Sequence, residues 1–166
     1  MAIKIPLVYC ESPVHTDDYY AERTAQLMAQ LGPDAVYIKD ANGAITPERV
    51  KTLVPAIQAH LGDLPLELHS HCTTGLAPVA YVEAIRLGVR TLHTAVPPLA
   101  NGASQPSIFN VIRNAHRLGY ATDIDEEAVR AESEHFRFVA SRENKPEGVP
   151  VEYDVFQYQH QIPGGM

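Results

Sequence analysis

The stretch AVYIKDANGAITPERVKTLVPAIQAHL, Ala35 to Leu61, decides how the fold is interpreted. It opens with an apolar run, Ala35 to Lys39, that is typical of a buried strand. Thr46 and Pro47 then mark a helix start, because a capping hydroxyl is followed by proline in the first turn. Apolar residues recur from there at helical intervals, at Val50, Leu53, Val54, Ile57 and Leu61. The stretch is therefore predicted to be one strand followed by one amphipathic helix.

The same unit recurs on both sides of this stretch. The other apolar runs are Ile3–Cys10, Leu64–His69 and Arg90–Val96, and the runs begin roughly 25 to 30 residues apart, the length of a strand-helix unit. Helices are expected after each of them, over 17–31, 77–87 and 108–118. Strands joined by helices in this way are parallel. From residue 123 the character changes to a charged helix, 125–142, and an extended segment, 151–162, so we divide the chain into 1–122 and 123–166.

Two α/β architectures agree with four strand-helix units. The first is half of a TIM barrel, since a whole barrel needs about 250 residues. The second is a small open doubly wound sheet. Such sheets often carry a glycine-rich phosphate loop after the first strand, whereas Cys10 to Pro13 reads CESP. We therefore predict half of a TIM barrel, carried by residues 1–122, with the start of a helical C-terminal extension.

Composition narrows the classes of partner. A net charge of −7 without a basic cluster gives no electrostatic reason to expect nucleic acid. No apolar run reaches the roughly 20 residues of a membrane helix, and the N-terminus lacks the pattern of a secretory signal. We therefore expect a cytoplasmic protein with small-molecule or protein partners. Cys10 and Cys72 are expected to be separate thiols in a reducing compartment.

Chemically useful residues gather at the predicted carboxyl ends of the strands, where active sites of parallel α/β folds lie. They are Tyr9, Cys10, Glu11, Lys39, Asp40, His69, His71, His93 and Thr94. Side chains two apart on a strand point to the same side, so His69 and His71 can face a common point. Imidazole suits zinc, cobalt, manganese or iron. The alternative is that the two rings are only hydrogen-bonded at a strand exit.

Lys39 ends the preceding strand and has two possible roles. A bare ammonium facing a barrel interior is unfavourable unless it is paired, so Lys39 could form an ion pair with Asp40 or Glu11. If instead its amine carries CO₂ as a carbamate (N6-carboxylysine), it becomes an anionic oxygen ligand. In that form Lys39 could join both imidazoles on one divalent metal.

The segments YIKDANGAITPERVKTLVPAI, LELHSHCTTG, TAVPPLANGASQPS and YQHQIPGGM resemble, in order, the motifs of the carboxyltransferase domain of biotin-dependent enzymes. This family includes pyruvate carboxylase, the oxaloacetate decarboxylase α subunit and the pyruvate-handling subunit of transcarboxylase. The resemblance covers nearly the whole chain and implies strands five to eight of a TIM barrel. It also implies a metal (Zn, Mn or Co) held by carbamylated Lys39, His69 and His71. The family's aspartate ligand, its arginine and glutamine, and its catalytic threonine lie on segments that this sequence lacks.

Two residues depart from the family pattern. Cys72 stands where many members have aspartate, and we interpret it as a packed thiol. His93 replaces an aspartate of the eighth strand, and we expect it to hydrogen-bond within the barrel end or to fill it, without binding metal. The loop ANGASQPS, residues 100–107, is expected to border the substrate pocket.

The resemblance implies carboxyl transfer between carboxybiotin and pyruvate, or decarboxylation of oxaloacetate, with the metal as Lewis acid for the enolate. Biotin would arrive on a separate carrier, and the partners would be the biotin carboxyl carrier and the biotin carboxylase components. Half a barrel exposes sheet edges and an apolar interior, so we expect another chain or copy to complete it and the isolated chain to be inactive. The alternatives are a hydroxymethylglutaryl-CoA-lyase-like metal-dependent lyase or aldolase, and a catalytically incomplete half-barrel that acts as an assembly partner.

Overall fold

Strands and helices alternate in the computed structural model, which describes residues 6–154. The order is β1 (Pro6–Cys10), α1 (Asp17–Leu31), β2 (Ala35–Asp40), α2 (Pro47–Gln58), β3 (Leu66–Ser70), α3 (Ala77–Arg86), β4 (Thr91–Leu92), α4 (Ile108–Arg117) and α5 (Glu126–Arg142). The alternation predicted from the four apolar runs is therefore confirmed.

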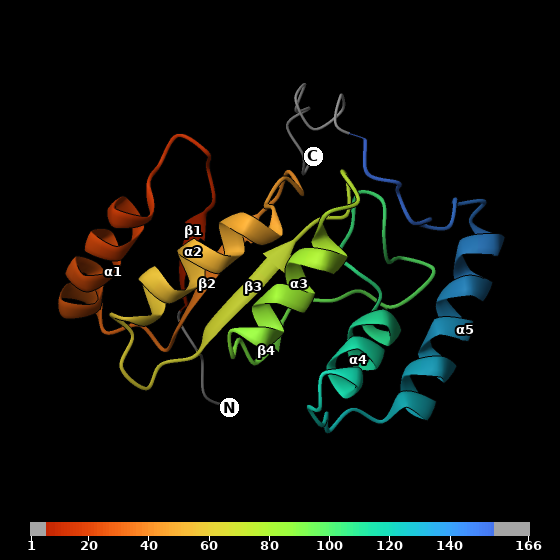
Figure 1. Ribbon diagram of the computed structural model, residues 1–166. Coiled ribbons are helices and arrows are strands. Elements are labelled where there is room, and N and C mark those ends of the chain that lie inside the picture. Colours follow the sequence, from red (N-terminus) through yellow and green to blue (C-terminus); the bar gives the residue numbers. More distant parts are fainter. Residues whose placement is uncertain (1–5, 155–166) are drawn as a thin grey trace.

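The four strands form one parallel sheet in the order β1-β2-β3-β4. Helices α1, α2, α3 and α4 pack one against the next, and Figure 1 shows α2 and α3 in front of the sheet. A doubly wound sheet reverses its strand order and carries helices on both faces. A sequential order with the crossover helices in one row is instead that of a barrel segment.

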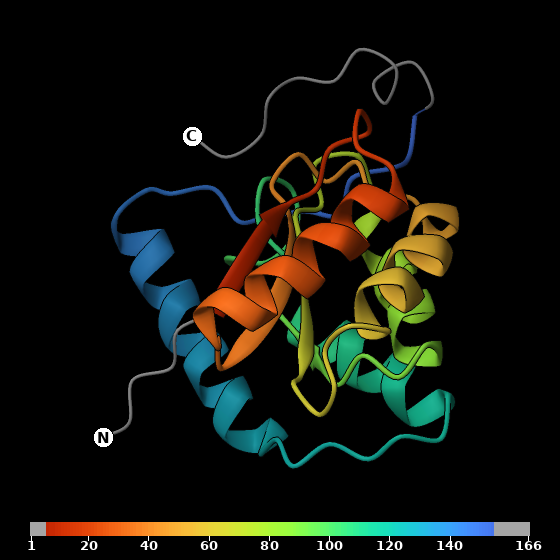
Figure 2. The same cartoon turned by 90° about the vertical axis from the view of Figure 1, so that its left-hand side faces the viewer.

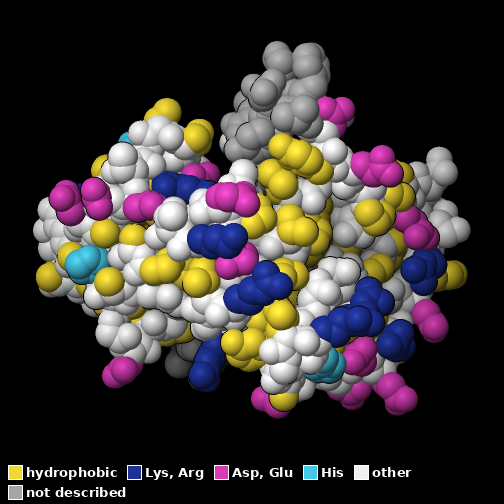
Figure 3. Space-filling model, in the orientation of Figure 1, with side chains coloured by type: hydrophobic (Ala, Val, Ile, Leu, Met, Phe, Trp, Pro, Cys, Tyr) yellow, Lys and Arg dark blue, Asp and Glu magenta, His cyan; other side chains and the backbone are white. Residues whose placement is uncertain are grey.

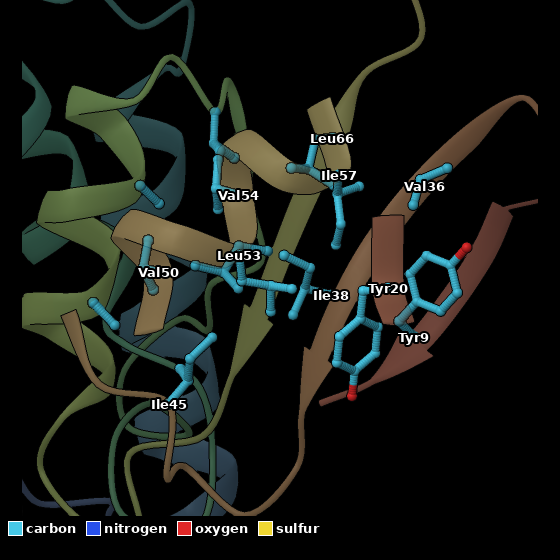
Figure 4. Close-up of a cluster of buried hydrophobic side chains, with 14 of the residues drawn as sticks. Tyr9, Tyr20, Val36, Ile38, Ile45, Val50, Leu53, Val54, Ile57 and Leu66 are labelled. Atoms are coloured by element: carbon cyan, nitrogen blue, oxygen red, sulfur yellow. The ribbon is translucent and has the colours of Figure 1, made fainter. Parts of the chain in front are cut away.

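The core lies between the sheet and these helices (Figure 4). Alternate residues of β2 and β3 point into it, and it is completed by the apolar stripe of α2 that the helical spacing predicted. Its members on these elements are Val36, Ile38, Leu66, Leu68, Val50, Leu53, Val54 and Ile57. The intervening residues of the two strands, among them Lys39 and His69, point to the other face of the sheet.

The helix boundaries follow local sequence signals. The Thr16 and Thr46 hydroxyls accept hydrogen bonds from the amides of Tyr19 and Arg49 and so cap α1 and α2. Gly32 ends α1 with a φ of 54°, a conformation that glycine adopts without a Cβ clash. These signals place each helix directly after the loop that leaves its strand.

The strand boundaries differ from those predicted. The fourth strand was predicted over Arg90–Val96, but β4 spans only Thr91–Leu92, the two residues that pair with β3. Its course continues through a hydrogen bond from His93 N to Leu68 O and a bridge from Ala95 to Ser107. The third strand runs over Leu66–Ser70 where Leu64–His69 was predicted. Residues 3–5 of the first run and 155–162 of the extended segment lie outside the described residues.

Helix α5 stands apart from the helical row. Figure 2 shows it on the opposite side of the sheet from α2 and α3, and it is tied to the rest by a hydrogen bond from Ser133 Oγ to Pro97 O, 2.6 Å.

No helix within residues 6–154 is long and apolar enough to cross a membrane. On the face seen in Figure 3, charges of both signs are interspersed with apolar side chains.

Candidate metal centre at the carboxyl ends of the strands

Strand alternation places Lys39 and His69 side by side. The two residues are partners in the ladder between β2 and β3, and both are half-buried, while their neighbours Ile38 and Leu68 are buried against the helices. Successive strand residues point to opposite faces. Lys39 and His69 therefore share the face of the sheet that the helical row leaves uncovered, at its carboxyl end.

His69 and His71 converge. Their Nε2 atoms are 3.1 Å apart and their ring centroids 5.2 Å apart. His71 Nδ1 is buried, and among the described residues it has no hydrogen-bond partner. The same-side orientation predicted for the pair is thus what the structure contains.

This geometry fits a shared divalent ion. Two imidazole nitrogens that each lie ~2.1 Å from one ion are about 3.0 to 3.4 Å apart at tetrahedral or octahedral angles, and the observed separation is 3.1 Å. Among the described residues, no group of three His, Cys, Asp or Glu side chains is arranged to hold a metal. A metal held by the two histidines would take a further ligand of another kind, and Lys39 is the adjacent candidate.

Lys39 has none of the ion pairs considered from the sequence. Within residues 6–154 it takes part in no salt bridge. Glu11 pairs with Arg49 at 3.3 Å, and the Asp40 carboxylate accepts its hydrogen bonds elsewhere. The interpretation of Lys39 as a structural ion pair with either acid is therefore not supported.

Asp40 organises the loop that follows β2. Its buried carboxylate accepts hydrogen bonds from the amides of Ala44 and Ile45, both at 3.0 Å, and from Ser70 Oγ at 2.7 Å. These bonds join the ends of β2 and β3. Gly43, in the same loop, has a φ of 67° and lies against the backbone of His71, so a Cβ there would clash with the His71 carbonyl. The loop thus fixes the backbone that carries the second histidine.

His93 extends the cluster. Its Nδ1 lies 3.1 Å from His69 Nδ1, and its Nε2 lies 2.9 Å from Glu67 Oε2. The Tyr81 hydroxyl donates to the His93 carbonyl at 2.7 Å and accepts from the Ser70 amide at 3.0 Å. Of the two roles expected for His93, hydrogen bonding within the barrel end or only filling it, the structure contains the first. Glu67 was missed as a candidate, although its position two residues before His69 places it on the same face.

The loop of residues 100–107 reaches the histidines. Gln105 Nε2 lies 3.4 Å from His69 Nε2, and the Ser104 carbonyl accepts a hydrogen bond from the Cys72 amide at 2.8 Å. Gln105 therefore borders the histidine pair. Its spacing in the sequence carries no signal for this placement, because only the tertiary fold brings the loop across β3.

Burial, followed by the nearby charges of His71, His93 and Lys39, lowers the pKa of His69 to about 4. Taking an imidazole out of water disfavours its charged form, so His69 is neutral at pH 7. A neutral imidazole retains one lone pair for a metal.

Burial also raises the pKa of the Cys72 thiol to about 12. Cys72 is thus a packed thiol, as expected from its position after an apolar run, and Cys10 is a free, exposed one.

Not all the strand-end candidates belong to this cluster. Tyr9 packs in the core against Tyr20, with ring centroids 5.7 Å apart. Glu11 and Arg49 form a separate ionic group with Asp17 at the end of β1. Thr94 lines a groove of about 510 Å³ between α3, β4 and α4, which none of the three predicted metal ligands lines. The residues brought together are Lys39, His69, His71, His93, Glu67 and Gln105.

The fold and the site together define the class of this protein. It is a parallel α/β half-barrel protein with paired histidines at the carboxyl ends of its strands. Its relationship to known proteins is consistent with that class: the chain belongs to the HMGL-like family, whose profile matches residues 6–135.

Relatives match nearly all of this chain. A pyruvate carboxylase subunit of Methanocaldococcus jannaschii is 34% identical over 163 residues, which are 96% of this chain and 28% of the relative. The methylmalonyl-CoA carboxyltransferase 5S subunit of Propionibacterium freudenreichii is 29% identical over 161 residues, 96% of this chain and 32% of that relative. The chain thus spans about a third or less of each relative. The resemblance to carboxyltransferase components seen in the sequence motifs is confirmed.

The fold is also found in a solved structure. The carboxyl transferase domain of Rhizobium etli pyruvate carboxylase superposes with a TM-score of 0.80 and 23% identity, covering 96% of this chain and 27% of the other. The chain therefore has the fold of part of a TIM-barrel carboxyltransferase domain, as predicted, and the small doubly wound sheet is excluded.

Proposed function

We propose that this chain is the metal-binding half of a carboxyltransferase that moves a carboxyl group between carboxybiotin and pyruvate, or removes it from oxaloacetate. The observation that carries the proposal is the convergence of His69 and His71, with Nε2 atoms 3.1 Å apart, beside Lys39 on the uncovered face of the sheet. The similarity of the chain to subunits of archaeal pyruvate carboxylases supports the choice of reaction.

His69, His71 and Lys39, the last as N6-carboxylysine, would hold the metal. A divalent ion here (Zn, Mn or Co) would supply a Lewis acid that polarises a 2-oxo acid and stabilises its enolate. The two imidazoles are uncharged ligands, so a carbamate on Lys39 would contribute the anionic oxygen that hard divalent ions favour. Gln105, 3.4 Å from His69 Nε2, is placed to donate a hydrogen bond to a substrate oxygen.

The remaining parts of the reaction would come from partners. The named relatives are components of carboxylases and a carboxyltransferase, and we propose biotin on a separate carrier together with a biotin carboxylase component. A further chain or copy would complete the barrel over the face of the sheet opposite the helical row, where Val8 is 38% exposed. We propose a cytoplasmic assembly, which the two free thiols, Cys10 and Cys72, support as a pattern usual in a reducing compartment.

One alternative is favoured by a specific observation. The matching family is HMGL-like, and a metal-dependent lyase or aldolase would use the same histidine pair on an acyl-CoA substrate. The proteins of similar sequence named above favour the carboxylase branch. A half-barrel that serves only in assembly is the third possibility, and it needs no metal.

Metal content tests the proposal. The chain is purified without chelator, in bicarbonate buffer, and its metals are quantified by plasma mass spectrometry. We expect about one divalent ion per chain, which is lost in His69→Ala and His71→Ala and kept in His60→Ala, a change at an exposed histidine. Absence of stoichiometric metal from the wild type, with its partner present, would favour assembly alone.

A cobalt-loaded sample distinguishes carboxyl transfer involving a 2-oxo acid from the lyase or aldolase reaction on an acyl-CoA. Pyruvate is expected to perturb the visible spectrum of the ion, while an acyl-CoA thioester leaves it unchanged. The opposite pattern would favour the lyase.

A further inference from the structure

A continuous line of polar contacts leads away from the proposed metal position along the face of the sheet opposite the helical row. It runs from Glu67 Oε2 to His93 Nε2 (2.9 Å), from His93 Nδ1 to His69 Nδ1 (3.1 Å), and from His69 Nε2 to His71 Nε2 (3.1 Å). Glu67 and His69 lie on β3, and His93 directly follows β4. Each ring nitrogen in the line has a neighbour, except His71 Nδ1 at the far end, which has none among the described residues.

The carboxylate sets the direction of these hydrogen bonds. An ionised carboxylate only accepts, so His93 Nε2 must carry a hydrogen and donate it to Glu67. With this single hydrogen, His93 has a lone pair on Nδ1 and accepts from Nδ1–H of His69. His69 in turn has its lone pair on Nε2, the atom that faces His71.

The contacts of His71, at the other end of the line, agree with this direction of hydrogen bonding. Without metal, the lone pair of His69 Nε2 faces His71 Nε2 at 3.1 Å, so His71 carries its hydrogen on Nε2. Its buried Nδ1, which lacks a partner among the described residues, is then a bare acceptor, and an unpaired acceptor is tolerated better than an unpaired N–H. One arrangement of hydrogens thus satisfies every contact in the line.

We propose that Glu67 and His93 are positioning residues that hold His69 as its Nδ1–H tautomer, with the Nε2 lone pair aimed at the metal position. This inference rests on the proposed metal site and adds the two residues that orient one of its ligands. A histidine ligand commonly donates its other N–H to a carboxylate or carbonyl. Here the carboxylate acts through a second imidazole.

The backbone of His93 is held on two sides, which makes the orientation stable. Its amide donates to Leu68 O at 2.9 Å, and its carbonyl accepts from the Tyr81 hydroxyl at 2.7 Å. The Tyr37 ring lies beside its imidazole, with centroids 5.1 Å apart. His69 has this support through His93, whereas His71 Nδ1 has none among the described residues.

The first test measures Zn²⁺ affinity by competition with a chromophoric chelator. Glu67→Leu and His93→Leu are each expected to weaken binding about 10- to 100-fold, the usual effect of removing an outer hydrogen-bond partner. Glu67→Gln keeps an acceptor oxygen and should retain most of the affinity. Glu83→Leu removes a carboxylate that pairs with Arg86 on α3 and is the matched control. Unchanged affinity in both leucine variants would overturn the inference.

The second test uses the metal-free protein and is independent of metal binding. Nitrogen-15 NMR of the histidine rings should show a hydrogen on Nδ1 of His69 and on Nε2 of His93, with the His69 tautomers becoming mixed in Glu67→Leu. A hydrogen on Nε2 of wild-type His69 would refute the positioning role. If the wild type binds no zinc but has the expected tautomers, the metal site fails while the hydrogen-bonded line stands.

Discussion

Replacing Asp40 with asparagine tests how the loop beneath the histidines is held. One carboxylate oxygen accepts from the amide of Ala44 and the other from the amide of Ile45 and from Ser70 Oγ. Asparagine has the same shape, but its NH₂ group only donates. Whichever way it is turned, at least one buried amide loses its acceptor and faces another donor.

The expected loss follows from these contacts. A hydrogen bond to a charged group is worth about 1.5 to 3 kcal/mol, and a buried donor left unpaired is unfavourable by a similar amount. Relief from burying a charge offsets part of this, so we expect Asp40→Asn to lower the free energy of unfolding by about 2 to 4 kcal/mol. Because domains are stable by about 5 to 15 kcal/mol in total, the effect is large.

Urea denaturation followed by circular dichroism measures this loss, and hydrogen exchange locates it. The amides of Ala44 and Ile45 should exchange faster in the variant. Asp63→Asn, at an exposed turn position, should change stability by less than about 0.5 kcal/mol. A loss below about 1 kcal/mol in Asp40→Asn with unchanged exchange would refute the view that this carboxylate organises the loop.

Three further predictions concern the same end of the sheet. A disulfide reagent at pH 8 should modify Cys10 quickly and Cys72 slowly, because burial raises the pKa of Cys72 to about 12; two fast thiols would contradict this. Gly43→Ala should lower the free energy of unfolding by about 1 to 3 kcal/mol in urea titrations, since its positive φ and close backbone neighbours leave no room for a Cβ; an unchanged midpoint would argue against that packing. Tyr81→Phe should lower the free energy of unfolding by about 1 to 3 kcal/mol by the same measurement, because it removes one buried and one partly buried hydrogen bond; a neutral result would show that its hydroxyl is dispensable.

The sequence predicted the order of the elements because each unit carries its own local signals. Apolar runs, the threonine caps at Thr16 and Thr46, and helical spacing are all encoded within one unit. The length of β4 was not predictable from these signals. The length of a strand depends on its hydrogen bonds to the adjacent strands, which local sequence does not specify. Among the described residues β4 pairs with β3 over two residues, where a strand of seven had been predicted.

The candidate site was also predictable only where local sequence determines it. The orientation of His69 and His71 followed from the period of a strand, which is a local property. The contacts that bring Glu67, His93 and Gln105 to His69 join residues 24 to 36 positions apart, which no local pattern specifies. Asp40 was considered as an ion-pair partner for Lys39, yet its carboxylate bonds to Ala44, Ile45 and Ser70, because side-chain alternation along β2 points the two residues to opposite faces.

X-ray absorption at the zinc edge tests the central claim most directly, because it reports the ligands themselves. For the zinc-loaded chain in bicarbonate buffer we predict two imidazoles together with oxygen ligands, all at about 2.0 to 2.2 Å. One imidazole should be lost in His71→Ala, and one oxygen in Lys39→Ala. A spectrum with sulfur at about 2.3 Å, or one without paired imidazoles, would contradict the assignment of Lys39, His69 and His71 as the metal centre.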